Sequence, residues 1–287
     1  MKALFDLPAP AKLNLFLHIV GRREDGYHLL QSAFMLVDWC DRLDLELHPH
    51  STLTREDCTA VLPDQDLCLR AAQALREATG STQGAHIRIT KSIPAQAGMG
   101  GGSSDAATVL LGLNRLWGLG LRREQLAAIG LRLGADVPFF IHGSHAWVEG
   151  VGERITPLTL PSARFVVVKP PVGLDTARIF SHPDLKRDTK PATIMGFAAN
   201  EFDFGQNDLQ PVAQQLCPEM VVALEWLQSK GLKARMTGSG SAVFARLRQD
   251  VALDDAPDAF EVRVCSNLDV HPLQGWADSN GLSVGSA

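Results

Sequence analysis

The sequence contains little that would build a disulfide framework or a membrane span. Its 287 residues include five cysteines, an odd number, and no two of them stand in a C-x-x-C spacing. This pattern argues against a disulfide scaffold and a cysteine zinc site, and it is typical of a reducing compartment. No run approaches about 18 uninterrupted apolar residues, and the opening residues lack the apolar stretch of a signal peptide. We therefore expect a soluble cytoplasmic protein without a membrane partner.

An excess of positive charge is also missing. Lys and Arg number 27 against 32 Asp and Glu, which gives a formal charge of −5. General nucleic-acid binders usually carry a broad basic surface, so no nucleic-acid partner is expected, although local basic sites for a small phosphate stay open. Hydrophobic residues make up 45% of the chain, which is enough for a folded core. At roughly 150 residues per domain, the length predicts two domains or one large one.

Hydrophobic periodicity predicts strands and helices in an irregular order. Residues 11–20 alternate apolar and polar side chains, so Lys12 and Asn14 are expected on the same face of a strand, off the core side. Further along the chain, apolar residues recur at the spacing of a helix, and short strands are expected between the helices. The predicted helices are 67–78, 104–117, 208–217 and 219–229. This order favours an α+β fold over a regular parallel barrel.

Two segments predict how the chain is divided and how it ends. The uncharged segment 156–162 contains two prolines, which favours a boundary between an N-terminal domain, 1–158, and a C-terminal domain, 159–287. Residues 273–287 are mostly polar or small and are expected to form a loose tail.

The most informative segment is a glycine-rich loop before the helix predicted from Ser104. Gly98 and Gly100–Gly102 leave the backbone bare, and a helix N-terminus offers free N–H groups and partial positive charge to a phosphate. Asp105, in the first turn, would favour the helix but repel an anion. The plainer alternative is a flexible loop with a serine cap. The loop lacks the lysine of a Walker A motif, and Ser103 stands at the third glycine of a Rossmann fingerprint.

Other segments carry candidate chemistry beside plainer interpretations. Lys12, taken alone, is best interpreted as a solvated residue of an edge strand. Asp136 lies between apolar segments, so its carboxylate has a partner or a task, or it caps a helix or turn. The residues Gly238, Ser239 and Gly240 predict a tight hairpin or a second phosphate-facing loop.

Histidines supply two more candidates. Tyr27, the only tyrosine, adjoins His28 in a polar turn, where the pair could stack on and hydrogen-bond a base or pack on its own strand. His142 and His145 form an H-x-x-H pair without carboxylate or cysteine ligands at usable spacing, which predicts structural or surface roles.

Taken together, these segments resemble the GHMP kinases. The motifs are PAKLNL at 10–15, IPAQAGMGGGSSDAA at 93–107, LGADVPFF at 133–140 and TGSGS at 237–241. Two further segments are similar to family members that act on a cytidine diphosphate ester, namely DGYHLLQS at 25–32 and EGVGER at 149–154.

The resemblance implies a two-domain α+β kinase with its active site in the interdomain cleft. It implies ATP as co-substrate, Mg²⁺ held mainly by the phosphates, and a small-molecule acceptor. That acceptor would be the 2-hydroxyl of a cytidine diphosphate ester of methylerythritol, in non-mevalonate isoprenoid precursor biosynthesis.

The resemblance also implies roles for single residues. Lys12 and Asp136 would form the catalytic pair, and Asn14 would help hold the sugar alcohol. The residues that would contact cytosine are Tyr27, His28 and Phe180. The residues that would bind ATP are Pro94, Ala95, Gln96, Ala97, Gly98, Met99, Gly100, Gly101, Gly102, Ser103 and Ser104.

Two residues depart from the family pattern, and two other function classes fit part of the sequence. Met99 replaces a common leucine, which conserves volume, and Asp66 replaces a common asparagine near the nucleotide. A kinase for homoserine or mevalonate is one alternative, and the turn at Tyr27 and His28 argues against it. A non-catalytic nucleotide-binding protein or a dehydrogenase is the other. The missing third glycine and the co-occurrence of Lys12 with Asp136 argue against both.

Overall fold

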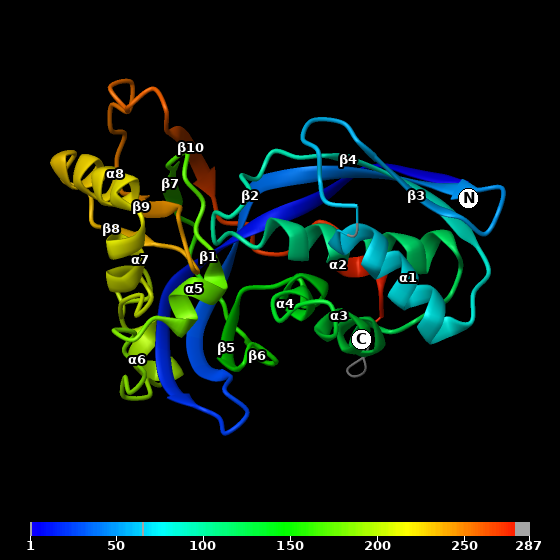
Figure 1. Cartoon of the computed structure of the whole chain (residues 1–287), viewed down its shortest axis with the longest axis horizontal. Helices are drawn as coiled ribbons and strands as arrows, with labels where there is room; N and C mark the ends of the chain where they lie inside the picture. The colour runs from blue at the N-terminus through cyan, green and yellow to red at the C-terminus, as the bar shows by residue number, and fades with distance from the viewer. Residues whose placement is uncertain (1, 65, 279–287) are drawn as a thin grey trace, which may run out of the picture.

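The structure is a computed structural model that describes residues 2–64 and 66–278. Two sheets organise these residues (Figure 1). In the first sheet the strand order is β3-β4-β2-β5-β6, and β1 pairs with β2. Its strands are β1 (Ala3–Arg22), β2 (His28–His48), β3 (Leu53–Asp57), β4 (Gly84–Thr90), β5 (Ala146–Gly150) and β6 (Arg154–Pro157).

The second sheet has the order β10-β7-β9-β8. Its strands are β7 (Arg164–Lys169), β8 (Ala234–Met236), β9 (Val243–Leu247) and β10 (Glu261–Ser266). The α+β prediction is therefore confirmed. The first sheet ends at Pro157 and the second begins at Arg164. The domain boundary after residue 158 stays a prediction.

A long antiparallel hairpin, β1 with β2, spans both halves of the molecule (Figure 1). Its two strands are joined by the turn that contains Tyr27. The register pairs Lys12 with Leu36 and Asn14 with Phe34. The strand predicted at 11–20 is thus part of a longer strand with several register shifts, one of which lies inside the predicted segment, between Asn14 and Leu17.

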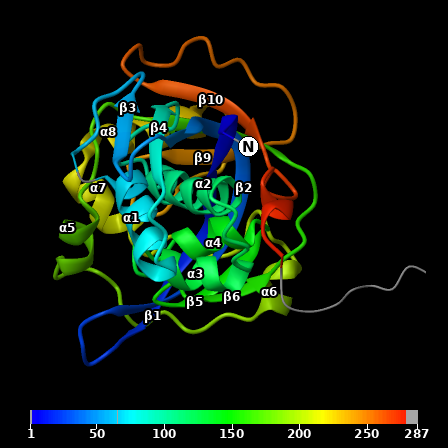
Figure 2. The ribbon, with the colours of Figure 1, turned by 90° about the vertical axis from the view of Figure 1, so that its right-hand side faces the viewer.

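Helices cover one face of the first sheet. They are α1 (Leu67–Thr79), α2 (Gly101–Leu116), α3 (Arg123–Leu131) and α4 (Val137–His142), and the first three lie together in Figure 2. Helix α1 begins at the N-cap Asp66, whose side chain accepts a hydrogen bond from the Leu69 N–H. It ends at Gly80 with φ 69°, as its sequence predicts. Alanine and leucine side chains of α1 and α2 fill the core beneath the sheet.

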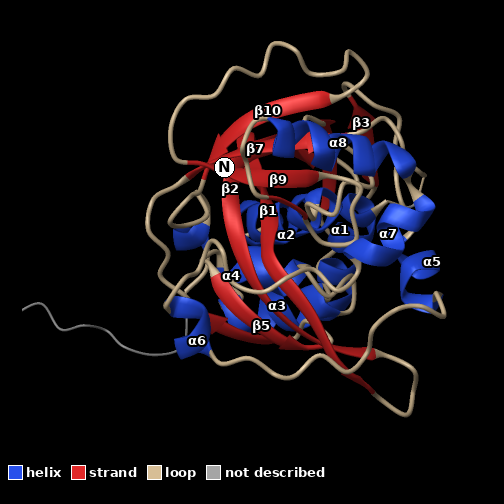
Figure 3. Ribbon diagram, turned by 90° about the vertical axis from the view of Figure 1, so that its left-hand side faces the viewer, coloured by secondary structure: helices blue, strands red, loops and turns tan. Residues whose placement is uncertain are grey.

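The second sheet has its own helical layer. It includes α5 (Thr176–Ser181), α6 (Ile194–Ala198), α7 (Gln210–Leu216) and α8 (Pro218–Ser229). Helix α8 lies over β7 and β9 in Figure 3, and its residues Met220, Ala223, Leu224 and Leu227 are buried. In the described part of the chain, no helix combines the length and the apolar character needed to span a bilayer.

The segment after β10 corrects one expectation. The loose-tail prediction is wrong for residues 273–278, because Leu273 and Ala277 are buried in the core of the first sheet. The Leu268 N–H donates to the Leu36 oxygen of β2, and the 3-10 helix Gln274–Trp276 follows. Figure 2 shows this segment, in red, returning along the first sheet. Residues 279–287 of the predicted tail lie outside the described residues.

Candidate active site

A cleft of about 1430 Å³ is lined by residues of both halves of the chain. The first half contributes Lys12 from β1 and Asp136 from the start of α4. The second contributes Phe180 from α5 and Ser239 from the loop between β8 and β9. Nearly all of the site residues predicted from the sequence therefore line one cavity.

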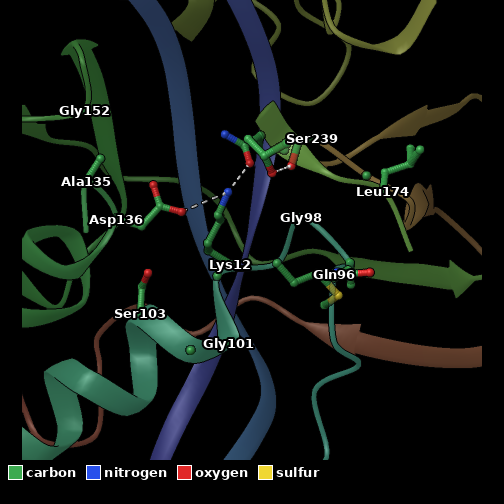
Figure 4. Close-up of a pocket in the computed structure, with 18 of the residues that line it drawn as sticks. Lys12, Gln96, Gly98, Gly101, Ser103, Ala135, Asp136, Gly152, Leu174 and Ser239 are labelled. Carbon is green, nitrogen blue, oxygen red and sulfur yellow. Dashed lines mark hydrogen bonds and ion pairs between the residues drawn. The ribbon is translucent and has the colours of Figure 1, made fainter. Parts of the chain in front are cut away.

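Lys12 and Asp136 meet in this cleft. The Lys12 ammonium lies 3.5 Å from an Asp136 carboxylate oxygen and donates a hydrogen bond to Asn14 Oδ1 (Figure 4). Lys12 and Asn14 are 3% and 1% exposed. The interpretation of Lys12 as a solvated edge residue is therefore wrong, because Phe34, the glycine loop and Asp136 pack around its side chain.

The surroundings of Lys12 make its charge weakly solvated. Burial lowers the pKa of Lys12, and the nearby Asp136 carboxylate opposes that shift. The ammonium also lies 4.7 Å from the ring centroid of Phe34, a cation–π contact. An ammonium held in this way is positioned to interact strongly with negative charge in the cleft.

Asp136 occupies the N-cap position of α4, but its side chain accepts no capping hydrogen bond. The carboxylate faces Lys12 and the cleft instead, and it is 29% exposed. The helix-cap alternative therefore describes the backbone position of Asp136 and does not account for its carboxylate, which remains available for chemistry.

The glycine loop leads into α2 earlier than the sequence predicts. The helix begins at Gly101 rather than near Ser104, and its N-cap Gly100 has φ 73°. A Cβ at Gly100 would lie 3.0 Å from the Phe140 ring, so only glycine fits there. The first N–H groups of α2 lack intrahelical partners, and Gly101 and Gly102 line the cleft. This geometry suits a phosphate.

Hydrogen bonds from both halves fix the loop in place. The Met99 oxygen accepts from the Lys12 N–H at 2.9 Å. The Gln96 and Ala97 oxygens accept from the N–H groups of Ser241 and Ala242 at 3.1 and 3.2 Å. The loop is therefore held against β1 on one side and the loop 237–242 on the other.

The segment 237–241 is a hairpin connection, since β8 and β9 pair antiparallel. Its glycines permit close approach to the first loop. A Cβ at Gly98 would lie 2.2 Å from the Thr237 oxygen, and one at Gly238 would lie 2.5 Å from the Gly98 oxygen. Gly238, Ser239 and Gly240 nevertheless line the cleft, so their proposed phosphate-facing role stays a prediction.

Thr237 is a residue of the site that sequence reasoning did not assign. Its hydroxyl accepts a hydrogen bond from the Asn14 N–H at 2.9 Å. The Asn14 amide donates to Ser32 Oγ at 3.0 Å while its oxygen accepts from Lys12. Thr237 and Ser32 therefore hold the residue that orients the ammonium. Both stand in recognised motifs, but only the fold brings them to Asn14.

Two residues at the start of α2 lie differently from expectation. Ser104 is fully buried and does not line the cleft; its N–H donates to the Gly100 oxygen, and its hydroxyl has no hydrogen-bond partner among the described residues. Asp105 pairs with Lys91 at 2.6 Å, and Lys91 also bonds to Asp41. Burial and Asp41 raise the pKa of Asp105 to about 8 against the opposing effect of Lys91. The raised pKa of Asp105 and its pairing with Lys91 both reduce the repulsion expected between Asp105 and an anion.

The residues predicted to contact cytosine lie at another part of the same cleft. The rings of His28 and Phe180 are in contact, with centroids 5.1 Å apart. Tyr27 is 64% exposed. Burial, Arg187 and Arg22 together lower the pKa of His28.

No group of three potential metal-ligating side chains occurs within residues 2–64 and 66–278. Of the H-x-x-H pair, His145 is buried and accepts a hydrogen bond from the Leu36 N–H at 3.2 Å. Its role is therefore structural, as its sequence predicts.

Models of the GHMP kinase N-terminal and C-terminal domains match residues 66–144 and 190–266. A 4-diphosphocytidyl-2-C-methyl-D-erythritol kinase of Albidiferax ferrireducens is 64% identical over the whole of both chains. A homologue with the same name from Paracidovorax citrulli is 64% identical over 96% of this chain and 99% of its own. 

A solved structure agrees with these sequence matches. The crystal structure of a 4-(cytidine 5'-diphospho)-2C-methyl-D-erythritol kinase superimposes with a TM-score of 0.76 at 34% identity, over 91% of this chain and 98% of the other. The chain belongs to the GHMP kinase family and, within it, to the 4-diphosphocytidyl-2-C-methyl-D-erythritol kinases.

Proposed function

We propose that this enzyme transfers the γ-phosphoryl group of ATP to the 2-hydroxyl of 4-diphosphocytidyl-2-C-methyl-D-erythritol. Membership of the GHMP kinase family implies the use of ATP, and the close relatives carry the name of this acceptor. The observation that carries the proposal is the pairing of Lys12 with Asp136 at 3.5 Å, beside the exposed start of α2.

Asp136 would take the proton of the acceptor hydroxyl as the new O–P bond forms. Its carboxylate makes no capping bond and faces the cleft, so it is free to accept that proton. General-base catalysis of this kind contributes about 10²–10⁴ in rate. Lys12 would stabilise the negative charge that develops on the hydroxyl and phosphoryl oxygens.

The glycine loop would bind the ATP phosphates. The first N–H groups of α2 and the bare backbone of Gly100–Gly102 offer donors without side chains in the way. Phosphoryl transfer depends mainly on positioning and charge stabilisation, and the loop is held rigidly from two sides.

Mg²⁺ would be held mainly by the ATP phosphates. The described residues offer no three-ligand cluster of their own, and Mg²⁺ commonly combines one or two protein oxygens with phosphates and water. Asp136 and Ser103 both carry side-chain oxygens and line the cleft (Figure 4). When bound, the metal would neutralise part of the negative charge of the phosphates.

The cytidine end of the acceptor would lie at Tyr27, His28 and Phe180. Stacking of a base on an aromatic ring contributes about 1–3 kcal/mol. Tyr27→Ala and Phe180→Ala should therefore raise the KM for the cytidine ester and leave the KM for ATP largely unchanged. An equal rise of both values would contradict this assignment.

A panel of acceptors tests the proposed function. The purified enzyme is incubated with γ-labelled ATP and Mg²⁺, and with the cytidine ester, homoserine or mevalonate. We expect phosphorylation of the cytidine ester with kcat/KM at least 10³-fold above the other two. Phosphorylation of homoserine or mevalonate with comparable efficiency would overturn the proposal.

A further inference from the structure

Arg187 joins the two aromatic residues at the cytidine end of the cleft. Its guanidinium donates hydrogen bonds to the backbone oxygens of Phe180, His182 and Leu185, at 3.3, 2.8 and 2.9 Å. Its Nε–H donates to His28 Nε2 at 3.1 Å. Since the His28 and Phe180 rings are in contact, one arginine fixes both members of the pair.

This hydrogen bond determines where the His28 proton lies. An arginine side chain stays protonated and can only donate, so His28 Nε2 must present its lone pair. An imidazolium ring has no lone pair to offer, and a neutral ring with its lone pair on Nε2 carries the proton on Nδ1. The lowered pKa of His28, caused by burial, Arg187 and Arg22, agrees with a neutral ring.

We propose that Arg187 is a positioning residue that fixes His28 as the neutral Nδ1–H tautomer, and that this donor selects cytosine over uracil. The proposal rests on the proposed function, because it assigns the cytidine end of the acceptor to His28. No intramolecular acceptor for His28 Nδ1 is found within residues 2–64 and 66–278, which leaves this donor for a ligand.

The two pyrimidines differ at the atom that such a donor can read. Ring nitrogen N3 of cytosine is an acceptor, whereas in uracil the same nitrogen carries a hydrogen and is a donor. Stacking on Phe180 or Tyr27 tolerates either base. A fixed Nδ1–H would pair with cytosine N3 and would leave two opposed donors with uracil, an arrangement that disfavours uracil once the base fills the site.

The tautomer can be measured directly in the wild-type enzyme. ¹⁵N-labelled histidine side chains are observed by NMR at pH 7, and His28→Gln identifies the signals of His28. We expect a neutral ring protonated on Nδ1. A ring protonated on Nε2, or on both nitrogens, would overturn the proposal, whatever the activity of the enzyme.

Substitutions then separate positioning from a purely structural role. Arg187→Met removes the donor, and Arg187→Lys keeps a cationic donor at the same position. Arg178→Met, which removes an exposed arginine of α5, is the matched control. The readouts are the His28 tautomer and the ratio of kcat/KM for the cytidine ester to that for its uridine analogue.

We expect Arg187→Met to mix the two tautomers and to lower the ratio about tenfold, the effect of one hydrogen bond of about 1.4 kcal/mol. Arg187→Lys should restore most of the ratio, and Arg178→Met should leave it unchanged. Equal losses on both esters with an unchanged tautomer would overturn the proposal. If Arg187→Met fails to fold, the wild-type spectrum and Arg187→Lys decide. Failure of the wild-type enzyme to phosphorylate the cytidine ester would refute the proposed function and leave the tautomer result standing.

Discussion

The ammonium of Lys12 lies between two oxygen-bearing side chains, with Asp136 at 3.5 Å and Asn14 as a hydrogen-bond acceptor. Lys12 comes from the middle of β1, and Asp136 from the residue before α4. Because Asn14 is itself held by Ser32 and Thr237, the pair is fixed from both halves of the chain. The arrangement places a cation and a free carboxylate beside the glycine loop.

Removal of the Lys12 charge should reduce turnover without unfolding the enzyme. Methionine has a similar length and suits a buried site, and Asp136 is left partly exposed to water. We expect Lys12→Met to lower kcat by about 10²–10³, the effect of removing one electrostatic stabiliser of the transition state. Steady-state kinetics measure the change, and Lys2→Met, at an exposed lysine, is the control. A kcat within threefold of wild type would exclude Lys12 from the chemistry.

Gly98→Ala should damage the nucleotide loop more than a comparable glycine substitution elsewhere. Gly98 has φ 72°, and a Cβ there would meet the Thr237 oxygen at 2.2 Å. Gly118 has φ 65° with nothing within 4 Å, so Gly118→Ala carries only the backbone strain of about 1–2 kcal/mol. Thermal unfolding and the KM for ATP compare the two. Gly98→Ala should lose more stability than Gly118→Ala, and only Gly98→Ala should raise the KM for ATP. Equal changes in the two variants would refute a role for the contact between Gly98 and Thr237.

The buried cluster of Lys91, Asp41 and Asp105 predicts a pH dependence of stability. Burial raises the pKa of Asp105 to about 8, above its unfolded value. The native state therefore retains a proton that the unfolded state releases, and stability falls as pH rises from about 4 to about 8. Asp105→Asn cannot titrate, so its stability relative to wild type should rise over this range. Denaturant unfolding at several pH values measures the difference, and a constant difference would contradict the raised pKa.

His271, in the segment that returns to the first sheet, predicts the opposite pH dependence: stability falls as the pH becomes acid. Burial lowers the pKa of His271 to about 4, and its Nδ1 accepts a hydrogen bond from the Leu273 N–H. The stability that His271 contributes is present above about pH 6.5 and is lost as pH falls through about 4. His271→Asn keeps an acceptor but does not titrate in this range. It should lose less stability than wild type between pH 6.5 and pH 4, as thermal melting would detect, and parallel curves would contradict this account.

Local sequence predicts features whose causes are local. Helix α1 follows from its cap at Asp66 and from Gly80, and the glycine loop follows from its bare backbone before a helix. The burial of Lys12 could not be predicted in this way, because segments far away in the chain cover β1. The same holds for the contact of Gly98 with Thr237 and for the bond from Arg187 to His28.

The C-terminal segment shows the same limit of local reasoning. Its polar composition predicts a loose tail, yet Leu273 and Ala277 are buried in the first core. Scattered apolar residues in a polar segment have no periodicity, so the sequence alone does not show that they pack into the core. The family resemblance identifies Asp136 as catalytic. Only the fold shows that Asp136 is the N-cap of α4 and that its side chain makes no capping hydrogen bond.

The central claim is that Asp136 accepts a proton beside Lys12 during phosphoryl transfer. The most direct measurement is the rate of single-turnover phosphorylation of the cytidine ester by Asp136→Asn. Binding of ATP and of the ester is measured separately. Asp258→Asn, at an exposed aspartate, is the control. We predict wild-type melting and binding with a phosphoryl-transfer rate reduced by about 10²–10⁴. A transfer rate near that of wild type, with both ligands bound, would contradict the account.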